Sequence, residues 1–414
     1  MTCFQPADIL LPQGIAWEDW AVIACDQFTS EPEYWRRVRE RVGESPSALQ
    51  LVFPEAELEH EPSERIRAIN ETMRRYERRG LFRTLEDSFV YTERTLSDGS
   101  CRRGLLGKID LERYDYRPGS SAAIRATERT VVERIPPRVK IREGASLELP
   151  HVLLLCDDEQ DAILAPLAAG GLGETLYDFE LMEGGGHIRG LRVSGAAATA
   201  VCERIAAYEA GVSARYADLG DTPMLYAVGD GNHSLASAKA CFEALKQRLG
   251  PEAAARHPAR YALVELGNLH DDSLRFEPIH RLVTQTDVPA LLEAARREIG
   301  APEGPEIPWL SGGESGTLRL NAKLGLLPVG VLQEFLDRWL QKHPGKLDYI
   351  HGEDSLRSLA GAENSIGFFL PAIEKSAFFR GVMADGVLPR KTFSMGQARD
   401  KRYYLEARRI QTPG

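Results

Sequence analysis

The sequence predicts an α+β fold in which mixed sheets are flanked by helices. Residues 151–156 and 224–228 are short, almost wholly apolar runs, as expected for strands that are covered on both faces. Residues 174–182 and 187–193 flank the glycine-rich turn 183–186, which predicts a β-hairpin. Segments with apolar residues at helical spacing lie between such strands without a fixed period, so a repeat architecture is not expected.

The other expected elements follow from apolar periodicity and turn residues. Residues 17–25 are expected to form a short strand, after which Thr29 or Ser30 caps a helix that ends near Val42. Residues 300–316 are rich in glycine and proline and are expected to form a surface excursion. Further helices are expected over 63–79, 196–210, 235–249, 329–342, 355–359 and 375–383, and further strands over 90–96, 101–110, 122–124, 261–267, 274–283 and 365–370.

Length and composition predict a folded chain of two parts. Its 414 residues, of which 43% are hydrophobic, can bury a large core. We expect an α/β unit over residues 1–245, which carries the Asp-Gly-Asn-His-Ser loop. An α+β unit over residues 246–414 is expected to pack against it and to complete a pocket.

Charge and cysteine spacing disfavour several partners. The formal net charge of −10 disfavours nucleic acid, because an acidic surface repels a phosphate polymer. The arginines between residues 36 and 41 lie among acidic residues, so we interpret them as a solvated helix face with ion pairs. The six cysteines form no CxxC pair and have no histidine at metal-ligand spacing, so no zinc site is expected.

The N-terminus lacks the basic start and the long apolar run of a signal peptide. No apolar stretch approaches the ~18 residues of a membrane helix. We therefore expect a cytoplasmic protein that has no membrane partner.

The most informative motif is a strand followed by Asp230-Gly231-Asn232-His233-Ser234 and then a helix. The first N–H groups of a helix lack intrahelical partners and attract anions, and glycine lets a ligand approach closely. The other four side chains of this loop can bind ligands or move protons. The alternative is a tight turn in which Asn232 or Ser234 caps the helix, but we favour a ligand site.

Arg125, Glu128 and Thr130 form a second candidate segment after a predicted strand. A phosphate site needs a cation and a hydroxyl, and proton transfer needs a carboxylate. The alternative is a charged edge strand or the start of a helix. His280 and Arg281 follow a proline-containing segment, and the histidine either faces the pocket or satisfies a buried backbone group.

Two further segments carry polar side chains near expected strands. Asp26 and Gln27 follow the first apolar segment, where α/β proteins place ligand-facing groups, although a turn role is favoured for them. Arg390, Lys391 and Thr392 combine cations with a hydroxyl and could close over a phosphate, and the alternative is an exposed strand. The GxxxxGK[ST], GxSxG and HExxH motifs are absent, so the common catalytic families are not indicated.

The strand, the Asp-Gly-Asn-His-Ser-Leu-Ala run and the following helix resemble the hallmark of a bacterial family catalogued only as domain of unknown function 1015. The resemblance covers most of the chain. It includes residues 125–130, 151–158, 177–182 with the glycine turn, 277–281 and 388–396.

That family is distantly similar to chromosome-partitioning ParB proteins, sulfiredoxins and an ADP-dependent free serine kinase. The resemblance implies a ParB/sulfiredoxin-like core and phosphate chemistry, with ATP or ADP and Mg²⁺ as candidate cofactors. The sequence departs from the family's usual Asp-Gly-His-His-Arg motif at Asn232 and Ser234. Loss of the arginine removes a bidentate phosphate partner.

The first functional hypothesis is a phosphate-handling enzyme for a small metabolite, such as a nucleotide-dependent kinase of a serine-like amino acid. Catalysis is assigned to His233 as proton donor and to Asp230 or Glu128 as base or Mg²⁺ ligand. The phosphate and the substrate are assigned to Gly231, Asn232, Ser234, Arg125, Thr130, His280, Arg281 and Lys391. The alternative is a non-catalytic nucleotide- or metabolite-binding module, comparable to a partition switch. No oligomeric state is predicted.

Overall fold

The computed structural model describes residues 2–57, 62–130, 135–170, 173–220, 222–389 and 391–412. Contacts between Cα atoms divide the chain into two units. The larger unit comprises Met1–Ala126, Thr130–Leu274 and Gln397–Gly414, and the smaller unit comprises Thr127–Arg129 and Arg275–Gly396. Whether the boundary expected at residue 245 separates independently folding domains stays a prediction.

The larger unit is built on a mixed sheet, in agreement with the predicted α+β class. Its strands are β1 (Phe4–Gln5), β2 (Ala7–Pro12), β4 (Phe82–Thr95), β5 (Cys101–Asp110), β6 (Tyr114–Asp115), β7 (Ile124–Ala126), β9 (Leu153–Cys156), β10 (Thr175–Glu180), β11 (His187–Val193), β12 (Tyr226–Asp230) and β13 (Tyr261–Asn268). The main strand order is β10-β11-β4-β5-β13-β9-β12-β7-β6. Strand β12 lies antiparallel to β9 and parallel to β7, so it is an inner strand of the sheet.

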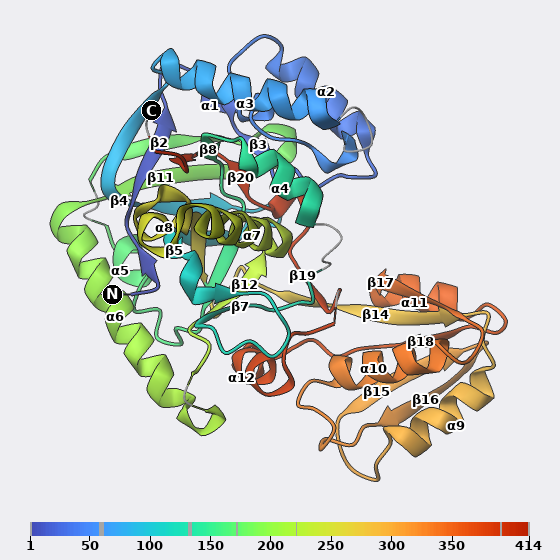
Figure 1. Ribbon diagram of the computed structural model, residues 1–414. Coiled ribbons are helices and arrows are strands. Elements are labelled where there is room, and N and C mark those ends of the chain that lie inside the picture. Colours follow the sequence, from blue (N-terminus) through green and yellow to red (C-terminus); the bar gives the residue numbers. More distant parts are fainter. Residues whose placement is uncertain are drawn as a thin grey trace. The chain divides into compact units, whose positions relative to one another are not determined.

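Helices flank this sheet. They are α1 (Trp17–Trp20), α2 (Pro32–Val42), α3 (Pro62–Arg78), α4 (Ile135–Glu143), α5 (Ala165–Ala168), α6 (Gly195–Arg215), α7 (Asn232–Leu249) and α8 (Pro251–Arg256). Figure 1 shows α2 and α3 together at the top of the view and α7 in front of the sheet. Among the described helices of the chain, none has both the length and the apolar character needed to cross a bilayer.

The smaller unit contains an antiparallel sheet with its own helices. Its strand order is β16-β15-β18-β14-β17, and β19 pairs with β14. The strands are β14 (Phe276–Thr284), β15 (Glu306–Ser311), β16 (Glu314–Arg319), β17 (Lys346–His351), β18 (Ile366–Phe368) and β19 (Phe393–Met395), and the helices are α9 (Val288–Glu298), α10 (Pro328–Leu340), α11 (Glu353–Ala360) and α12 (Lys375–Asp385).

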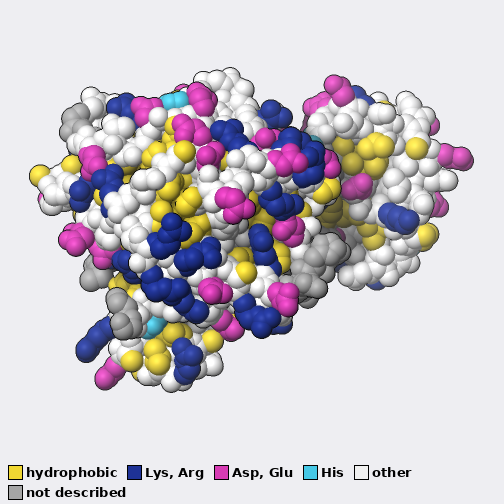
Figure 2. Space-filling model, turned by 90° about the horizontal axis from the view of Figure 1, so that it is seen from above, with side chains coloured by type: hydrophobic (Ala, Val, Ile, Leu, Met, Phe, Trp, Pro, Cys, Tyr) yellow, Lys and Arg dark blue, Asp and Glu magenta, His cyan; other side chains and the backbone are white. Residues whose placement is uncertain are grey.

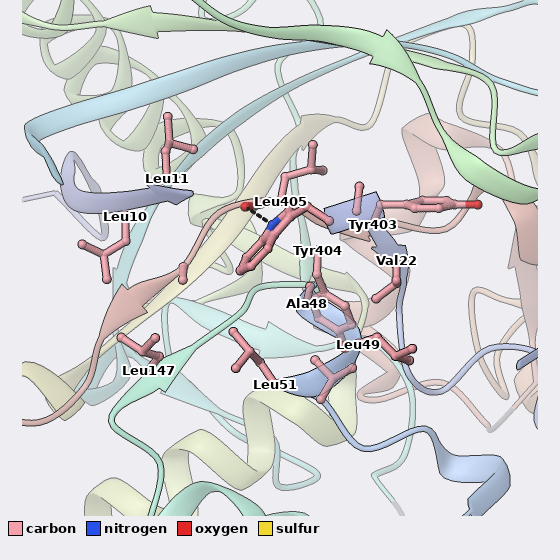
Figure 3. Packing of buried hydrophobic residues seen from close by; sticks show 14 of the residues in the cluster. Leu10, Leu11, Val22, Ala48, Leu49, Leu51, Leu147, Tyr403, Tyr404 and Leu405 are labelled. Carbon is pink, nitrogen blue, oxygen red and sulfur yellow. Dashed lines mark hydrogen bonds between the residues drawn. The ribbon is translucent and has the colours of Figure 1, made fainter. Parts of the chain in front are cut away.

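The C-terminal segment returns to the core of the larger unit. There β20 (Tyr403–Tyr404) pairs with β3 (Val22–Ile23), and β21 (Arg408–Arg409) pairs with β8 (Leu147–Glu148). The carbonyl of Leu405 accepts a hydrogen bond from the Trp20 indole at 2.9 Å, drawn as a dashed line in Figure 3. Because this segment is buried, the backbone just before β20 is fixed within the larger unit.

The strand expected over residues 17–25 is wrong in its first half. Trp17–Trp20 form helix α1, and only Val22–Ile23 are a strand. Two acidic residues in the first turn favour the helix. The Trp20 side chain is buried by its contact with the distant C-terminal segment, and local sequence patterns do not contain such a contact.

The surface excursion expected over residues 300–316 is wrong from Glu306 onward. From Glu306 the chain forms the hairpin of β15 and β16, with a turn at Gly312 and Gly313, both of which have positive φ. A Cβ atom at Gly316 would lie 2.6 Å from the Trp309 ring. Glycine in this strand therefore makes room for a tryptophan on its partner strand. The prediction failed because the abundance of glycine was interpreted as a sign of a loop.

Helix α2 carries the basic run as a solvated face with ion pairs. Each of its four arginines, Arg36, Arg37, Arg39 and Arg41, lies within 4 Å of a carboxylate. Figure 2 shows basic and acidic side chains interspersed over the surface seen from above. The helix begins at Pro32 with Glu31 as its N-cap, so the expected caps Thr29 and Ser30 are wrong.

Candidate functional site

The Asp-Gly-Asn-His-Ser loop joins β12 to α7 as predicted. Residues 224–228 are buried, and the helix begins at Asn232, two residues before Ser234. Its N-cap is Gly231, with φ 78° and ψ 25°, so neither Asn232 nor Ser234 caps the helix. Leu235 makes the first helical hydrogen bond, to the Gly231 carbonyl. The preceding N–H groups of the first turn therefore have no acceptor within the helix.

Gly231 packs closely against the start of β9. A Cβ atom at this position would lie 3.0 Å from Cα of Val152 and 3.4 Å from Cδ2 of His151. Positive φ and lack of space therefore both require glycine here. This contact brings His151 next to the loop, although the two segments are remote in sequence.

Asp230 is an ionised carboxylate held by two donors. Its Oδ1 accepts the Gly231 N–H at 2.9 Å, and its Oδ2 lies 3.2 Å from Nζ of Lys401. Burial opposes the charge, but Lys401 and then His151 outweigh burial and hold the pKa of Asp230 below its ordinary value. At neutral pH this group can therefore bind a cation or accept a hydrogen bond, and it cannot donate a proton.

His151 connects the loop with a second group of polar side chains. Its Nδ1 lies 2.8 Å from the Tyr404 hydroxyl, and its Nε2 lies 3.9 Å from Oδ2 of Asp26. Burial raises the pKa of Tyr404 well above its ordinary value, so this hydroxyl keeps its proton. It donates to Cys25 Sγ at 3.2 Å. Asp26 thus faces a histidine as well as its neighbour Gln27, whose amide donates to it.

Two buried guanidinium groups hold the backbone that presents Lys401. Arg94 donates to the carbonyls of Arg399, Asp400 and Lys401 at 2.7, 3.1 and 2.5 Å. Arg102, its cross-strand neighbour, donates to the Asp400 carbonyl at 3.0 Å. Burial lowers the pKa of Arg94 to about 9. We call Arg94 and Arg102 the arginine clamp.

Sequence reasoning missed Lys401, His151 and Tyr404. Their partners lie in other parts of the chain, so no local pattern places them at the loop. A weak signal existed in the charged run 399–402, which directly precedes the buried residues of β20. Such a run beside a buried strand is unusual for a solvated surface segment.

The predicted residue Arg125 belongs to β7, beside β12, but its guanidinium serves the backbone. It donates to the carbonyls of Ala122 at 2.7 Å and of Thr222. Thr222 lies before the start of β12, whereas the Asp-Gly-Asn-His-Ser loop lies at the end of β12. The guanidinium of Arg125 therefore contacts the backbone at the opposite end of the strand from the loop. Thr130 also belongs to the larger unit, and its hydroxyl is buried without a hydrogen-bond partner among the described residues. Their part in phosphate binding stays a prediction.

The smaller unit brings Glu128, Arg281 and Lys391 together. Arg281 is fully buried and donates to the Lys391 carbonyl at 3.0 Å, and Glu128 accepts the N–H of Thr392 at 3.2 Å. His280 is buried, and its Nδ1 accepts the Leu370 N–H. That satisfies a backbone group, which was the alternative interpretation. Convergence of this cluster with His233 stays a prediction, and Arg390 lies outside the described residues.

Asp157, Glu159 and His270 are the only group in the described parts of the chain with metal-ligand geometry, their ligand atoms lying within 4.8 Å of one another. Asp157 already accepts from Tyr216 at 2.6 Å and from Arg215 at 2.8 Å, and it lies 2.7 Å from Nε2 of His270. Arg215 also pairs with Glu159. These contacts explain the cluster without a metal.

The residues of the loop fit a phosphate with Mg²⁺. Lys401 and the first N–H groups of α7 suit phosphate oxygens. The carboxylate of Asp230 and an amide oxygen are oxygen ligands of the kind that Mg²⁺ prefers. Among the described residues, no donor reaches the buried Oδ1 of Asn232.

Several solved structures are weakly similar to the chain. A free serine kinase variant in complex with AMP is 13% identical, with a TM-score of 0.39, over 73% of this chain and 90% of that chain. A conserved hypothetical protein from Pyrococcus furiosus is 12% identical, with a TM-score of 0.35, over 73% and 94%. SbnI from Staphylococcus aureus is 11% identical, with a TM-score of 0.37, over 74% and 87%.

No curated protein matches the sequence. The model of the family described as "Protein of unknown function (DUF1015)" matches residues 8–407, which is nearly the whole chain. The chain therefore belongs to the DUF1015 family.

Proposed function

We propose that the protein is a phosphate-handling enzyme that acts on a small metabolite, with its site at the Asp-Gly-Asn-His-Ser loop. The observation that carries this proposal is the pairing of ionised Asp230 with Lys401 at the start of α7. A cation and the first N–H groups of a helix suit phosphate, and a fixed carboxylate suits its metal ion.

In the proposed mechanism each residue has one task. Lys401 and the first-turn N–H groups bind and orient the phosphate, and they offset its charge. Asp230 and the amide oxygen of Asn232 would hold Mg²⁺, which supplies charge neutralisation on phosphoryl oxygens. His233, at the second position of the helix, takes up the proton that the attacking hydroxyl loses, or donates a proton to the leaving phosphate.

The proposed reaction is phosphoryl transfer between a nucleotide and a hydroxyl-bearing metabolite of amino-acid size, of which serine is the simplest. A part for Glu128, Arg281 and Lys391 of the smaller unit in this reaction stays a prediction.

A non-catalytic binding module is the second candidate. The Lys401 contact favours it, because a carboxylate with a lowered pKa is a poor proton acceptor at neutral pH. A site without an effective base binds phosphate without transferring it.

The test is a thermal-shift screen with ATP, ADP, AMP and phosphoserine, each with and without Mg²⁺. A ligand present at 100 times its Kd adds about 2.7 kcal/mol to the free energy of unfolding. Transfer is then followed by phosphorus NMR with serine and other hydroxylated amino acids. Binding with transfer supports the enzyme, binding alone supports the module, and no shift with any phosphate compound contradicts both.

A further inference from the structure

An apolar cavity of about 130 Å³ lies beside the loop in the larger unit. Its walls come from segments remote in sequence, including Leu51, Phe53, Met73, Ile141, Ala145 and Leu147. Figure 3 shows Leu51, Leu147 and Tyr404, which line the cavity from three different segments. A cavity of this size among apolar side chains is comparable to an engineered cavity of ~150 Å³ that binds benzene.

The charged side chains of the wall are already paired. Arg138 forms an ion pair with Glu55, and Arg142 lies 2.5 Å from Glu148, which also pairs with Arg408. Their charges are therefore offset within the protein. The cavity offers a ligand mainly apolar surface, which selects an uncharged group.

Two residues lie both at the loop and in the wall of the cavity. Ser234 belongs to the first turn of α7 and also lines the cavity. His151 lines the cavity, and its Cδ2 would lie 3.4 Å from a Cβ atom at Gly231. A ligand whose polar end lies at the loop can therefore place an adjoining apolar group in the cavity.

We propose that the substrate carries a compact apolar group, about the size of a benzene ring, which this cavity binds. The polar end of the same molecule lies at residues 230–234, and this half of the proposal rests on the proposed phosphate-handling function. The hydroxymethyl side chain of serine is too small to fill the cavity. The substrate class is thus a phosphorylated or hydroxyl-bearing metabolite with an apolar tail.

The apolar half is tested with benzene and protein labelled with ¹³C in the methionine methyl groups. The chain has six methionines, and Met73 lines the cavity, whereas the buried Met182 and Met224 do not. The Met73 resonance, assigned with Met73→Leu, should shift saturably, and those of Met182 and Met224 should not. Absence of a saturable Met73 shift, or equal shifts of all three, overturns the proposal.

A second test of the apolar half uses variants in which a larger side chain fills the cavity. Ala145→Phe places a ring in the cavity and should abolish the benzene response, and Ile141→Phe does so from a half-buried position if the first variant does not fold. Ala244→Phe adds the same ring at an exposed position of α7 and should leave the response unchanged. Undiminished benzene binding in a folded, filled variant contradicts the assignment.

The link between the two halves is tested with inorganic phosphate, methyl phosphate and benzyl phosphate. Benzyl phosphate should bind about 10- to 100-fold more tightly than methyl phosphate, because its ring leaves water. The filled variant should lose this preference and keep its affinity for inorganic phosphate. Equal binding of the two esters overturns the tail inference and leaves the proposed function standing. A Met73 response to benzene without binding of any phosphate overturns the proposed function and the polar half of this proposal.

Discussion

Nζ of Lys401 lies 3.2 Å from Oδ2 of Asp230, at the point where β12 ends and α7 begins. The two residues are remote in sequence and meet because the C-terminal segment is buried in the larger unit. Burial of Asp230 by itself disfavours its charge, and Lys401 reverses that effect. The start of the helix thus holds a cation and a fixed carboxylate together.

Lys401→Gln should raise the pKa of Asp230, because it removes the cation that favours the charged form. In the wild type the lowered pKa stabilises the fold at neutral pH, and this contribution is lost as the pH falls through the folded-state value. The variant should therefore be less stable by about 1–3 kcal/mol at pH 7, with the difference shrinking in acid. Urea unfolding over a pH series measures this.

Lys246→Gln is the matched control for that variant. Lys246 pairs with Glu112 at 2.6 Å on the surface, where both side chains are about one-third exposed. Such pairs contribute ~0–1 kcal/mol. A loss for Lys401→Gln that matches the control, or that is equal at every pH, contradicts the assigned role of Lys401.

Arg94→Lys should disturb the presentation of Lys401, since lysine cannot reproduce the planar set of donors that binds four carbonyls, those of Gly185 and of residues 399–401. We expect a loss of stability of about 2–4 kcal/mol. We also expect a raised pKa of Asp230, which carbon NMR of its carboxyl group measures. A purely structural role would leave that pKa unchanged in the folded variant. Arg83→Lys, on the same strand in an exposed pair with Glu174, should change neither quantity appreciably.

The strand, loop and helix of the site could be predicted because their signals are local. An apolar run, a glycine and helical periodicity lie within one continuous segment, and the structure has β12 within two residues and the start of α7 within three residues of the expected positions. Strand β5 was likewise predicted with its observed bounds, residues 101–110.

The partners of the loop could not be predicted, because they depend on pairing between distant strands. Lys401 reaches Asp230 through the pairing of β20 with β3, and Tyr404 reaches His151 through the same pairing. The local pattern of a single sequence does not show which distant strands pair. Helix α1 was missed for the same reason, since Trp20 is fixed by the C-terminal segment.

Gly231→Ala should destabilise the protein more than Gly250→Ala, although both glycines flank α7 with nearly equal φ, 78° and 82°. Both variants incur the cost of positive φ, about 1 kcal/mol. Only Gly231→Ala also crowds Val152, because nothing lies within 4 Å of a Cβ atom at Gly250. We expect a further loss of about 1–3 kcal/mol for Gly231→Ala in urea unfolding. Equal losses would show that the loop can move away from β9.

His233→Ala should reduce turnover by about 10²–10⁴-fold, the usual contribution of a proton-transferring side chain. The fold should remain, because His233 is only half-buried at the start of α7. Affinity for the phosphate ligand found in the thermal-shift screen should change little, and Asn232→Ala should reduce turnover less. Calorimetry measures the affinity, and phosphorus NMR measures the turnover.

The half-buried His187, which lies 2.9 Å from Asp178 in the same unit, provides the control for that experiment. His187→Ala removes an imidazole remote from the loop and should leave turnover unchanged. If His233→Ala binds the ligand normally and the wild type turns over nothing under any nucleotide or metal condition, no proton chemistry belongs to the loop. The binding module would then replace the enzyme, because Asp230, Lys401 and the helix N–H groups suffice to hold an anion without a base.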